Sequence, residues 1–253
     1  MSDFDRNYAA PSRGLGAGRA VAIDQGLRAY MIRIYNYMAV GVALTGVVAW
    51  LTFNAATVAD ASGKLSLTPF GQAIYSGPAV IVLFIGTLGL VFLISWMIER
   101  LQPSTAFALF LVYAGVLGLM LSSVFLTYTG ASITRVFFIS AAAFAGLSLY
   151  GYTTQRDLSP IGSFLVMGLI GLIIAMVVNM FLKSTQLDFV ISAAGVLIFA
   201  GLTAWDTQKI KNMYDVNDDG TIAGRKSVMG ALTLYLDFIN LFLFLLRLMG
   251  DRR

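Results

Sequence analysis

Seven long apolar runs constrain this sequence more than any other feature. A helix needs about 20 apolar residues to cross the hydrocarbon core of a bilayer. Because lipid cannot hydrogen-bond to the backbone, a segment that crosses the bilayer without closing into a barrel must be helical. The sequence therefore predicts an all-α integral membrane protein with seven transmembrane helices. The runs cover residues 30–53, 77–98, 105–128, 135–154, 160–182, 188–208 and 229–249.

The low proportion of charged residues agrees with this fold class. Of the 253 residues, 58% are hydrophobic and only 12% are charged, whereas soluble proteins carry about 25% charged residues. Most of the surface must therefore face lipid. We expect a flexible tail at residues 1–29, a transmembrane domain at 30–250 and a short C-terminal tail at 251–253.

The chain contains no cysteine and no histidine. This excludes disulfides, thiol chemistry, imidazole metal sites and every histidine-based catalytic triad. The basic residues lie in loops and tails without interleaved aromatic residues, which suits an anionic bilayer surface better than nucleic acid. We expect no cofactor, no nucleic-acid partner and no enzymatic activity.

Lysine and arginine are distributed unevenly between the two sets of loops. Because these residues concentrate on the cytoplasmic side of membrane proteins, the N-terminus is predicted to be cytoplasmic. Seven full crossings would place the C-terminus outside, but residues 251–253 are basic, so a re-entrant last segment is an open alternative. The predicted inner side holds Arg6, Arg13, Arg19, Arg28, Arg100, Arg156, Lys209, Lys211, Arg225 and Lys226, and the outer side holds Lys64, Arg135 and Lys183.

The seventh run carries a stripe of polar residues. Steps of three and four residues place Thr233, Asp237, Asn240 and Arg247 on one face of a helix. An aspartate at the centre of a membrane helix costs at least about 2.5–3.5 kcal/mol. The stripe must therefore face protein or water, and we expect the seventh helix to be central.

A second carboxylate, Asp206, closes the sixth run. The loop after it is predicted to be cytoplasmic, so Asp206 and Asp237 belong to the same half of the membrane and could approach each other. Two adjacent carboxylates cannot both ionise cheaply, which makes a shared proton the expected state. When both protons leave, the pair could bind a hard cation such as calcium. The alternatives are an interfacial role for Asp206 and a structural hydrogen bond for Asp237.

Two other charged features allow a functional and an ordinary interpretation. Glu99 and Arg100 end the second run, where they are either interfacial charges or partners of the aspartate pair in a gating salt bridge. Residues 215–226 match several positions of an EF-hand calcium loop, but Lys226 replaces the glutamate required at the last position. A polar turn is the alternative for that segment.

A repeated pattern of small residues concerns helix packing. Gly-x-x-Gly-Leu occurs at 86–90, 115–119 and 168–172. Small residues allow helices to approach closely in lipid. We expect these three segments to lie at tight helix contacts.

Two segments resemble the signature motifs of the bacterial Bax-inhibitor family of transmembrane proteins. The first is residues 232–243, Leu-Thr-Leu-Tyr-Leu-Asp-Phe-Ile-Asn-Leu-Phe-Leu, and the second is Trp-Asp-Thr-Gln at 205–208. Trp205 departs from the family pattern, which usually has tyrosine there. The likeness extends over roughly residues 25–250.

The resemblance implies six helices around a central seventh and a pH-sensitive calcium leak controlled by Asp206 and Asp237. It also implies an arginine latch, for which Arg100 is the match. Some bacterial members modulate a membrane-bound AAA protease through the N-terminal tail. We therefore predict a pH-sensitive calcium leak channel of the bacterial inner membrane, with a protease modulator as the alternative. An intramembrane aspartyl protease is disfavoured because its Gly-Asp setting is absent around both aspartates.

Overall fold

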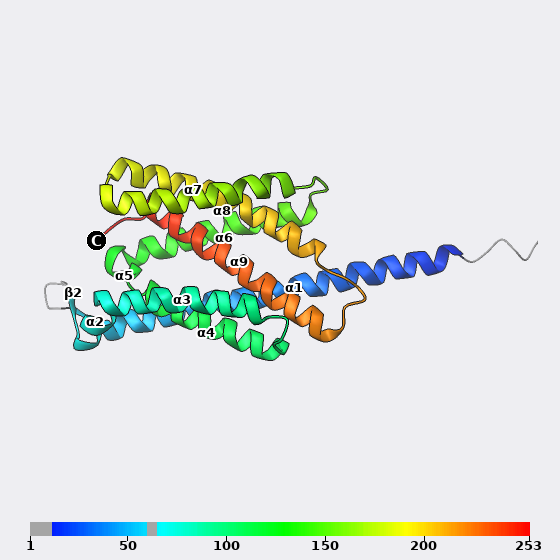
Figure 1. Ribbon diagram of the computed structural model, residues 1–253, viewed down its shortest axis with the longest axis horizontal. Helices are drawn as coiled ribbons and strands as arrows, with labels where there is room; N and C mark the ends of the chain where they lie inside the picture. The colour runs from blue at the N-terminus through cyan, green and yellow to red at the C-terminus, as the bar shows by residue number, and fades with distance from the viewer. Residues whose placement is uncertain (1–11, 60–64) are drawn as a thin grey trace, which may run out of the picture.

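The computed structural model describes residues 12–59 and 65–253, with side chains from residue 25 onward. Within these ranges seven helices are long and apolar enough to cross a membrane, which confirms the predicted fold class. They run side by side along the long axis of the molecule (Figure 1). The seven helices are α1 (Ser12–Ala56), α3 (Gly77–Met97), α4 (Pro103–Leu121), α6 (Gly130–Thr153), α7 (Ser159–Leu182), α8 (Thr185–Asn212) and α9 (Gly220–Met249).

Shorter elements lie at the end of the bundle where α9 ends (Figure 1). Strands β1 (Thr57–Ala59) and β2 (Leu65–Leu67) pair antiparallel, and α2 (Pro69–Ile74) follows them. Helix α5 (Val124–Thr127) is a single turn between α4 and α6. We call this the C-terminal end of the bundle. The opposite end, where α8 ends and α9 begins, is the N-terminal end.

Helix starts are set by residues that satisfy the free backbone N–H groups of a first turn. The side chains of Ser76, Thr129 and Ser184 accept hydrogen bonds from the first turns of α3, α6 and α8. Prolines stand in the first turns of α3, α4 and α7, where no N–H donor is needed. The loops between the crossings can therefore be short.

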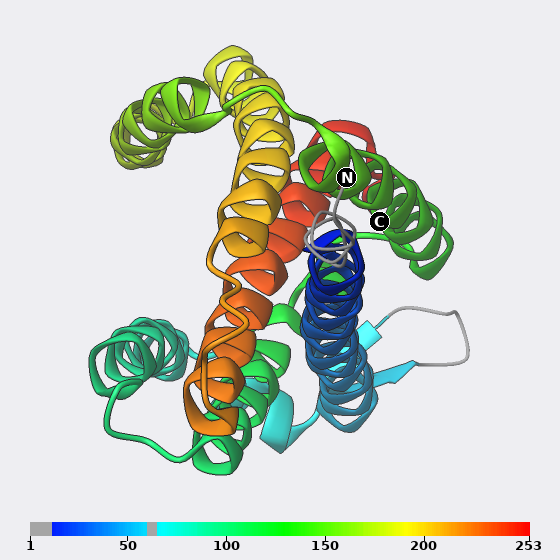
Figure 2. The same cartoon turned by 90° about the vertical axis from the view of Figure 1, so that its right-hand side faces the viewer.

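Helix α9 occupies the centre of the bundle, as its polar stripe predicts. In its most apolar stretch 72% of the residues are buried, against at most 39% in the other crossings of the described chain. Helices α1, α4, α6 and α8 pack against it, whereas α3 packs mainly on α4 and α7 mainly on α8. Figure 2 shows α3 and α7 at the periphery. A ring of six helices around α9 is therefore not confirmed.

The N-terminal part of α9 begins earlier than the apolar run predicts, at Gly220 instead of 229. Asp219 caps this helix by accepting from the backbone N–H groups of Thr221 and Ile222. Asp218 pairs with Lys226 at 2.6 Å. The acidic residues of the calcium-loop-like segment therefore start a helix, in agreement with the polar-turn alternative.

The first helix also begins earlier than predicted. Helix α1 starts at Ser12 and continues without a break into the first crossing, so residues 12–29 are helical and not a flexible tail. Residues 19–29 are rich in alanine, arginine, leucine and glutamine, which favour helix. Extending an existing helix also avoids the cost of nucleation. Residues 1–11 lie outside the described residues.

The C-terminus lies at the end of the bundle opposite to the start of α1 (Figure 1). The 30 residues of α9 form one continuous helix of about 45 Å, which is long enough for a full crossing. The residues after it are bound locally: Asp251 pairs with Arg135 at 2.9 Å, and Arg253 N donates to Thr127 O at 2.9 Å. The basic side chains are also bound there: Arg252 lies 4.0 Å from Asp188, and Arg253 Nε donates to Tyr128 O at 3.3 Å.

Most glycines of the Gly-x-x-Gly-Leu segments are not at tight contacts, so that prediction was largely wrong. A Cβ at Gly86, Gly89, Gly115 or Gly171 would meet no atom within 4 Å. Gly118 is the clear exception, because a Cβ there would lie 2.8 Å from Thr45 O. A Cβ at Gly168 would lie at an ordinary contact distance of 3.4 Å from Ile198, and the closest helix approaches use glycines outside the motif.

Gly151 provides a test of close packing between α6 and α8. A Cβ at this position would lie 2.1 Å from Ala204 O, a backbone atom that cannot rotate away. We expect Gly151→Ala to lower the free energy of unfolding by about 1–3 kcal/mol. Thermal unfolding in detergent measures this change. Gly146→Ala on the same helix is the matched control, because a Cβ there meets nothing within 4 Å. Equal melting temperatures for the two variants would contradict the packing.

Candidate functional site

Asp206 of α8 and Asp237 of α9 lie together inside the bundle. Their side chains are 7% and 5% exposed, and their carboxyl groups are within hydrogen-bonding reach of each other. Oδ2 of Asp237 is buried with no hydrogen-bond partner among the described residues. Two ionised carboxylates are both acceptors and cannot bond to each other. This contact is favourable when a proton lies between them.

Close packing on both sides fixes the pair. Towards the C-terminal end, Gly195 of α8 leaves room for the Phe244 ring, since a Cβ would lie 2.5 Å from Cδ1. Towards the N-terminal end, a Cβ at Gly230 of α9 would lie 3.1 Å from Ile210. These contacts hold two antiparallel helices, joined by a short loop, at the separation that two carboxyl groups require. Because α9 begins at Gly220, Asp237 lies near the middle of its helix.

A cavity of about 530 Å³ adjoins the pair between α7, α8 and α9. The stripe residues Thr233, Asp237, Asn240 and Arg247 line it along α9, as the sequence predicts for a face that avoids lipid. Ten residues of helix separate Asp237 from Arg247, or about 15 Å. The remaining wall is mostly apolar, formed by Val166, Leu169, Leu172, Ile173, Met176, Phe199, Leu202, Trp205, Leu236, Leu243 and Phe244.

Two polar residues of the stripe bond to their own helix. Thr233 Oγ1 donates to Met229 O at 3.0 Å, and Asn240 Nδ2 donates to Leu236 O at 2.8 Å. The hydroxyl donor of Thr233 and one of the two N–H donors of Asn240 are thus occupied. The oxygen atoms of these side chains remain the groups with which they could bind a cation in the cavity.

Cations stand at both ends of this cavity. At one end Lys209, three residues after Asp206 on α8, does not line the cavity itself but lies 5.1 Å from the centre of the ring of Trp205, which does. At the other end Arg247 pairs with Asp188 at 3.7 Å. Sequence reasoning did not assign Lys209 or Asp188 to the site. The three-residue spacing on a helix could have indicated Lys209, whereas Asp188 is brought there only by packing.

The candidate latch residues lie outside this constellation. Glu99 and Arg100 follow the end of α3, and both are exposed. In the part of the chain that the structure describes, no ion pair joins Arg100 to either aspartate. Glu99 lines a different pocket, with Arg225 and Lys226. Helix α3 packs mainly on α4 and not on the helices of the pair. The latch role of Arg100 therefore stays a prediction.

The predicted calcium role also rests on the pair alone. Across residues 25–59 and 65–253, whose side chains the structure describes, no group of three or more carboxylates, histidines or cysteines could hold a metal ion. Calcium takes six to eight oxygen ligands. Asp206 and Asp237 would therefore need oxygen atoms from Thr233, Asn240 or water to complete a site, which favours transient over tight binding.

A separate polar contact anchors α9 on its other side. Tyr235 is fully buried, and its hydroxyl lies 2.7 Å from Thr45 Oγ1 of α1. Thr45 also lies 2.9 Å from Ala114 O of α4. This contact ties three helices together. It was missed from the sequence, because tyrosine and threonine in an apolar run give no signal of their partners.

The chain is similar to one protein family and to proteins of several bacteria. Residues 27–253 match the family model described as inhibitor of apoptosis-promoting Bax1, and this region contains both aspartates. An uncharacterised protein of Rickettsia prowazekii is 48% identical over 230 residues, 91% of this chain and 92% of that protein. Inner membrane protein YbhL of Escherichia coli K12 is 46% identical over 90% of this chain and 94% of its own. An uncharacterised membrane protein of Streptococcus pyogenes is 36% identical over 90% of this chain and 94% of that protein.

A proton shared between Asp206 and Asp237 would make the stability of the protein depend on pH. At low pH one carboxyl donates to the other, and as the pH rises and the proton leaves, two like charges face each other. We expect the melting temperature of the wild-type protein in detergent to fall through this change. For a chain of this size, each 1 kcal/mol of lost stability lowers it by roughly 2–4 °C. Asp237→Asn should remove this fall, because the amide donates to Asp206 at every pH.

The control variant is Asp215→Asn, which changes an exposed carboxylate in the loop before α9. It should keep the wild-type pH profile. A profile of Asp237→Asn that coincides with the wild type would show that the two carboxyl groups share no proton.

Proposed function

We propose, on the premise that this chain belongs to the Bax inhibitor-1 family of membrane proteins, that it is a pH-sensitive calcium leak channel of the bacterial inner membrane. Family membership rests on the match over residues 27–253 and on relatives at up to 48% identity. The inner-membrane location is supported by the relative that carries this location in its name. The Asp206–Asp237 pair is the proposed gate.

The observation that carries this proposal is a pair of buried carboxyl groups facing a cavity inside a membrane bundle. Burying a carboxyl group in lipid is costly, and such residues usually line ion or proton pathways. Here Asp237 is 5% exposed, yet the cavity beside it holds about 530 Å³. A purely structural aspartate needs hydrogen-bond donors but no adjoining space.

The proposed gate works through one proton. With a proton shared between Asp206 and Asp237, the two carboxyl groups hold α8 against α9. The pair then carries one negative charge instead of two and binds a cation less well. When the proton leaves, the like charges repel and the site becomes a ligand for a hard cation. Because the ligands must be deprotonated, cation occupancy of the pair rises with pH.

The far end of the cavity supplies a second barrier. Arg247 lines the wall there and pairs with Asp188, while Arg252 lies 4.0 Å from the same carboxylate. A positive side chain in the path opposes cation passage. A conducting state therefore requires Arg247 to leave the cavity wall, so this ion pair and the aspartate pair act in series.

Calcium flux through the purified full chain tests the proposal. Protein in vesicles loaded with a calcium-sensitive dye should show a leak whose rate changes with pH. Asp206→Asn and Asp237→Asn should each abolish the pH dependence, because the remaining carboxylate accepts from the amide and no longer shares a proton with a second carboxyl group. Asp215→Asn serves as the control and should retain it. A leak with unchanged rate and pH profile in both pair variants would sink the proposed gate.

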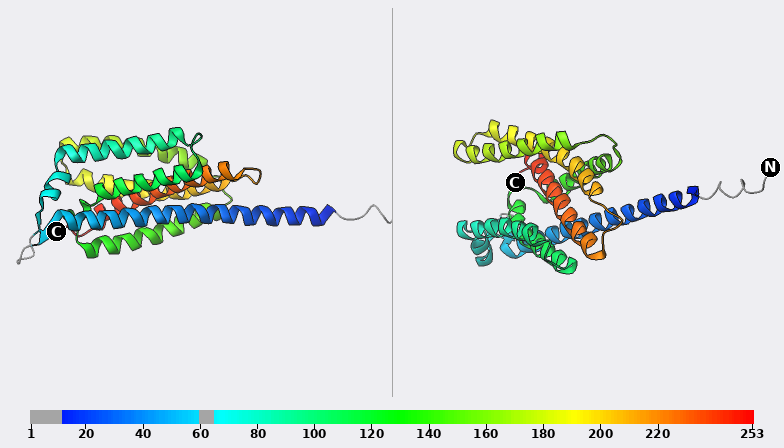
Figure 3. Two further views of the ribbon diagram at one scale, coloured as in Figure 1. Left: turned by 90° about the horizontal axis from the view of Figure 1, so that it is seen from below. Right: turned by 45° about the vertical axis from the view of Figure 1, so that its right-hand side comes forward.

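A second candidate function is modulation of a membrane-bound AAA protease. The observation that favours it is the first part of α1, which extends past the other helices at the N-terminal end of the bundle (Figures 1 and 3). A helix continuous with a transmembrane crossing is a semi-rigid handle for a partner.

Deleting residues 1–24 separates the two functions. This variant removes the first part of α1, ahead of the apolar run that begins at residue 30. For a protease modulator we expect loss of the effect on protease activity in a reconstituted mixture, while calcium flux stays at the wild-type rate. Full retention of protease modulation by the shortened chain would contradict this role for the extension.

A further inference from the structure

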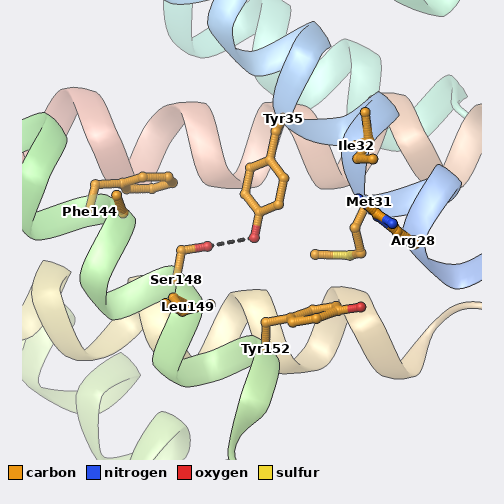
Figure 4. Close-up of a pocket in the computed structure, with 9 residues that line it drawn as sticks. Arg28, Met31, Ile32, Tyr35, Phe144, Ser148, Leu149 and Tyr152 are labelled. Carbon is orange, nitrogen blue, oxygen red and sulfur yellow. Dashed lines mark hydrogen bonds between the residues drawn. The ribbon is translucent and has the colours of Figure 1, made fainter. Parts of the chain in front are cut away.

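A second cavity, separate from the aspartate pair, opens between α1 and α6. Its volume is about 630 Å³, within the range of ligand-binding sites. Both helices pack on α9, and the groove lies between them (Figure 4). The lining segments are residues 28–35 of α1 and 144–152 of α6, so it runs for about 12 Å along the helices.

Three hydroxyl groups at or beside the middle of this groove, those of Tyr35, Ser148 and Thr207, use their hydrogens for bonds within the protein. Thr207 Oγ1 donates to Thr203 O at 2.7 Å. Ser148 Oγ, 3.0 Å from Thr207 Oγ1, must then donate to it, and Tyr35, 2.6 Å from Ser148, must donate to Ser148. The hydroxyl hydrogens of Tyr35, Ser148 and Thr207 are therefore all directed into the protein. Beside Ile32, Phe144 and Leu149, the surface left over suits a hydrocarbon chain.

Donors and positive charge gather at one end of the groove. Arg28 lies there on α1, two residues before the apolar run at 30–53 begins, which is where the sequence predicts the bilayer interface. The Tyr152 hydroxyl points towards the same side (Figure 4). Lys211 of α8 donates to Tyr152 O at 2.8 Å, with its ammonium 5.7 Å from the centre of the Tyr152 ring. The groove is therefore cationic at the interface and apolar deeper in the membrane.

We propose that this groove binds one anionic phospholipid. Its headgroup phosphate accepts from Arg28 and is attracted by Lys211, and one acyl chain lies between Ile32 and Leu149. The ligand class follows from the charge pattern: a zwitterionic lipid carries a cation that Arg28 and Lys211 repel, and a soluble anion leaves the apolar part empty. The proposal is independent of ion conduction, since none of the groove residues belongs to the aspartate cavity.

Native mass spectrometry of the detergent-solubilised full chain tests this site. The probes are dioleoyl phosphatidylglycerol, dioleoyl phosphatidylcholine and glycerol phosphate. We expect one tight phosphatidylglycerol molecule per chain, weaker phosphatidylcholine and no retained glycerol phosphate. Arg28→Gln should weaken phosphatidylglycerol binding about fivefold, as expected for one cation near a lipid headgroup. Ala145→Trp should remove the tight molecule by filling the groove.

Matched controls lie on the same two helices. Arg33→Gln removes an exposed charge of α1 that does not line the groove, and Ala131→Trp adds the same bulk near the other end of α6. Both should bind phosphatidylglycerol as the wild type does. Equal binding of the two lipids by the wild type, or an undiminished tight molecule in Arg28→Gln or Ala145→Trp, overturns the proposal. Retention of glycerol phosphate at equal affinity also overturns it, because a chain-free anion would then suffice.

Discussion

The contact between the carboxyl groups of Asp206 and Asp237 is buried inside a bundle of apolar helices, where water reaches little of either group. A carboxylate at the centre of a membrane helix is tolerated only against protein or enclosed water. Helix α9 must therefore be surrounded, and α8 must lie against it at the level of Asp237. The central position of α9, its high burial and the cavity on its polar face are consequences of this requirement.

Close approaches of backbone and side chain hold this arrangement. Gly195 leaves room for the Phe244 ring between α8 and α9, and Gly151 leaves room for the Ala204 carbonyl between α6 and α8. On the opposite side the Tyr235 hydroxyl meets Thr45. In lipid, where burial of apolar surface does not drive helices together, such packing and hydrogen bonds supply the specificity. Helices α3 and α7, which have less of this packing on α9, lie at the periphery.

Two hollows of different character result from the same packing. The cavity between α7, α8 and α9 has carboxyl groups at its middle and an arginine at its far end, a pattern that suits a cation path with a gate. The groove between α1 and α6 has satisfied hydroxyl groups at its middle and cations at one end, a pattern that suits a lipid. The cavity and the groove adjoin consecutive residues of α8: Asp206 belongs to the aspartate pair, and Thr207 is hydrogen-bonded to Ser148 beside the groove.

The sequence by itself determined the class, the number of crossings and the polar face of α9, because lipid allows few residues at each position and a helix repeats every 3.6 residues. It also indicated Asp206 and Asp237, since carboxylates are rare in such runs. Tertiary structure alone decided that Asp188 meets Arg247, that Arg100 makes no ion pair with the aspartates, and that Tyr35 reaches Ser148. The reason is physical: these contacts depend on the rotation and register of one helix against another, and apolar helices of similar composition leave both undetermined until small residues and buried polar groups fix them.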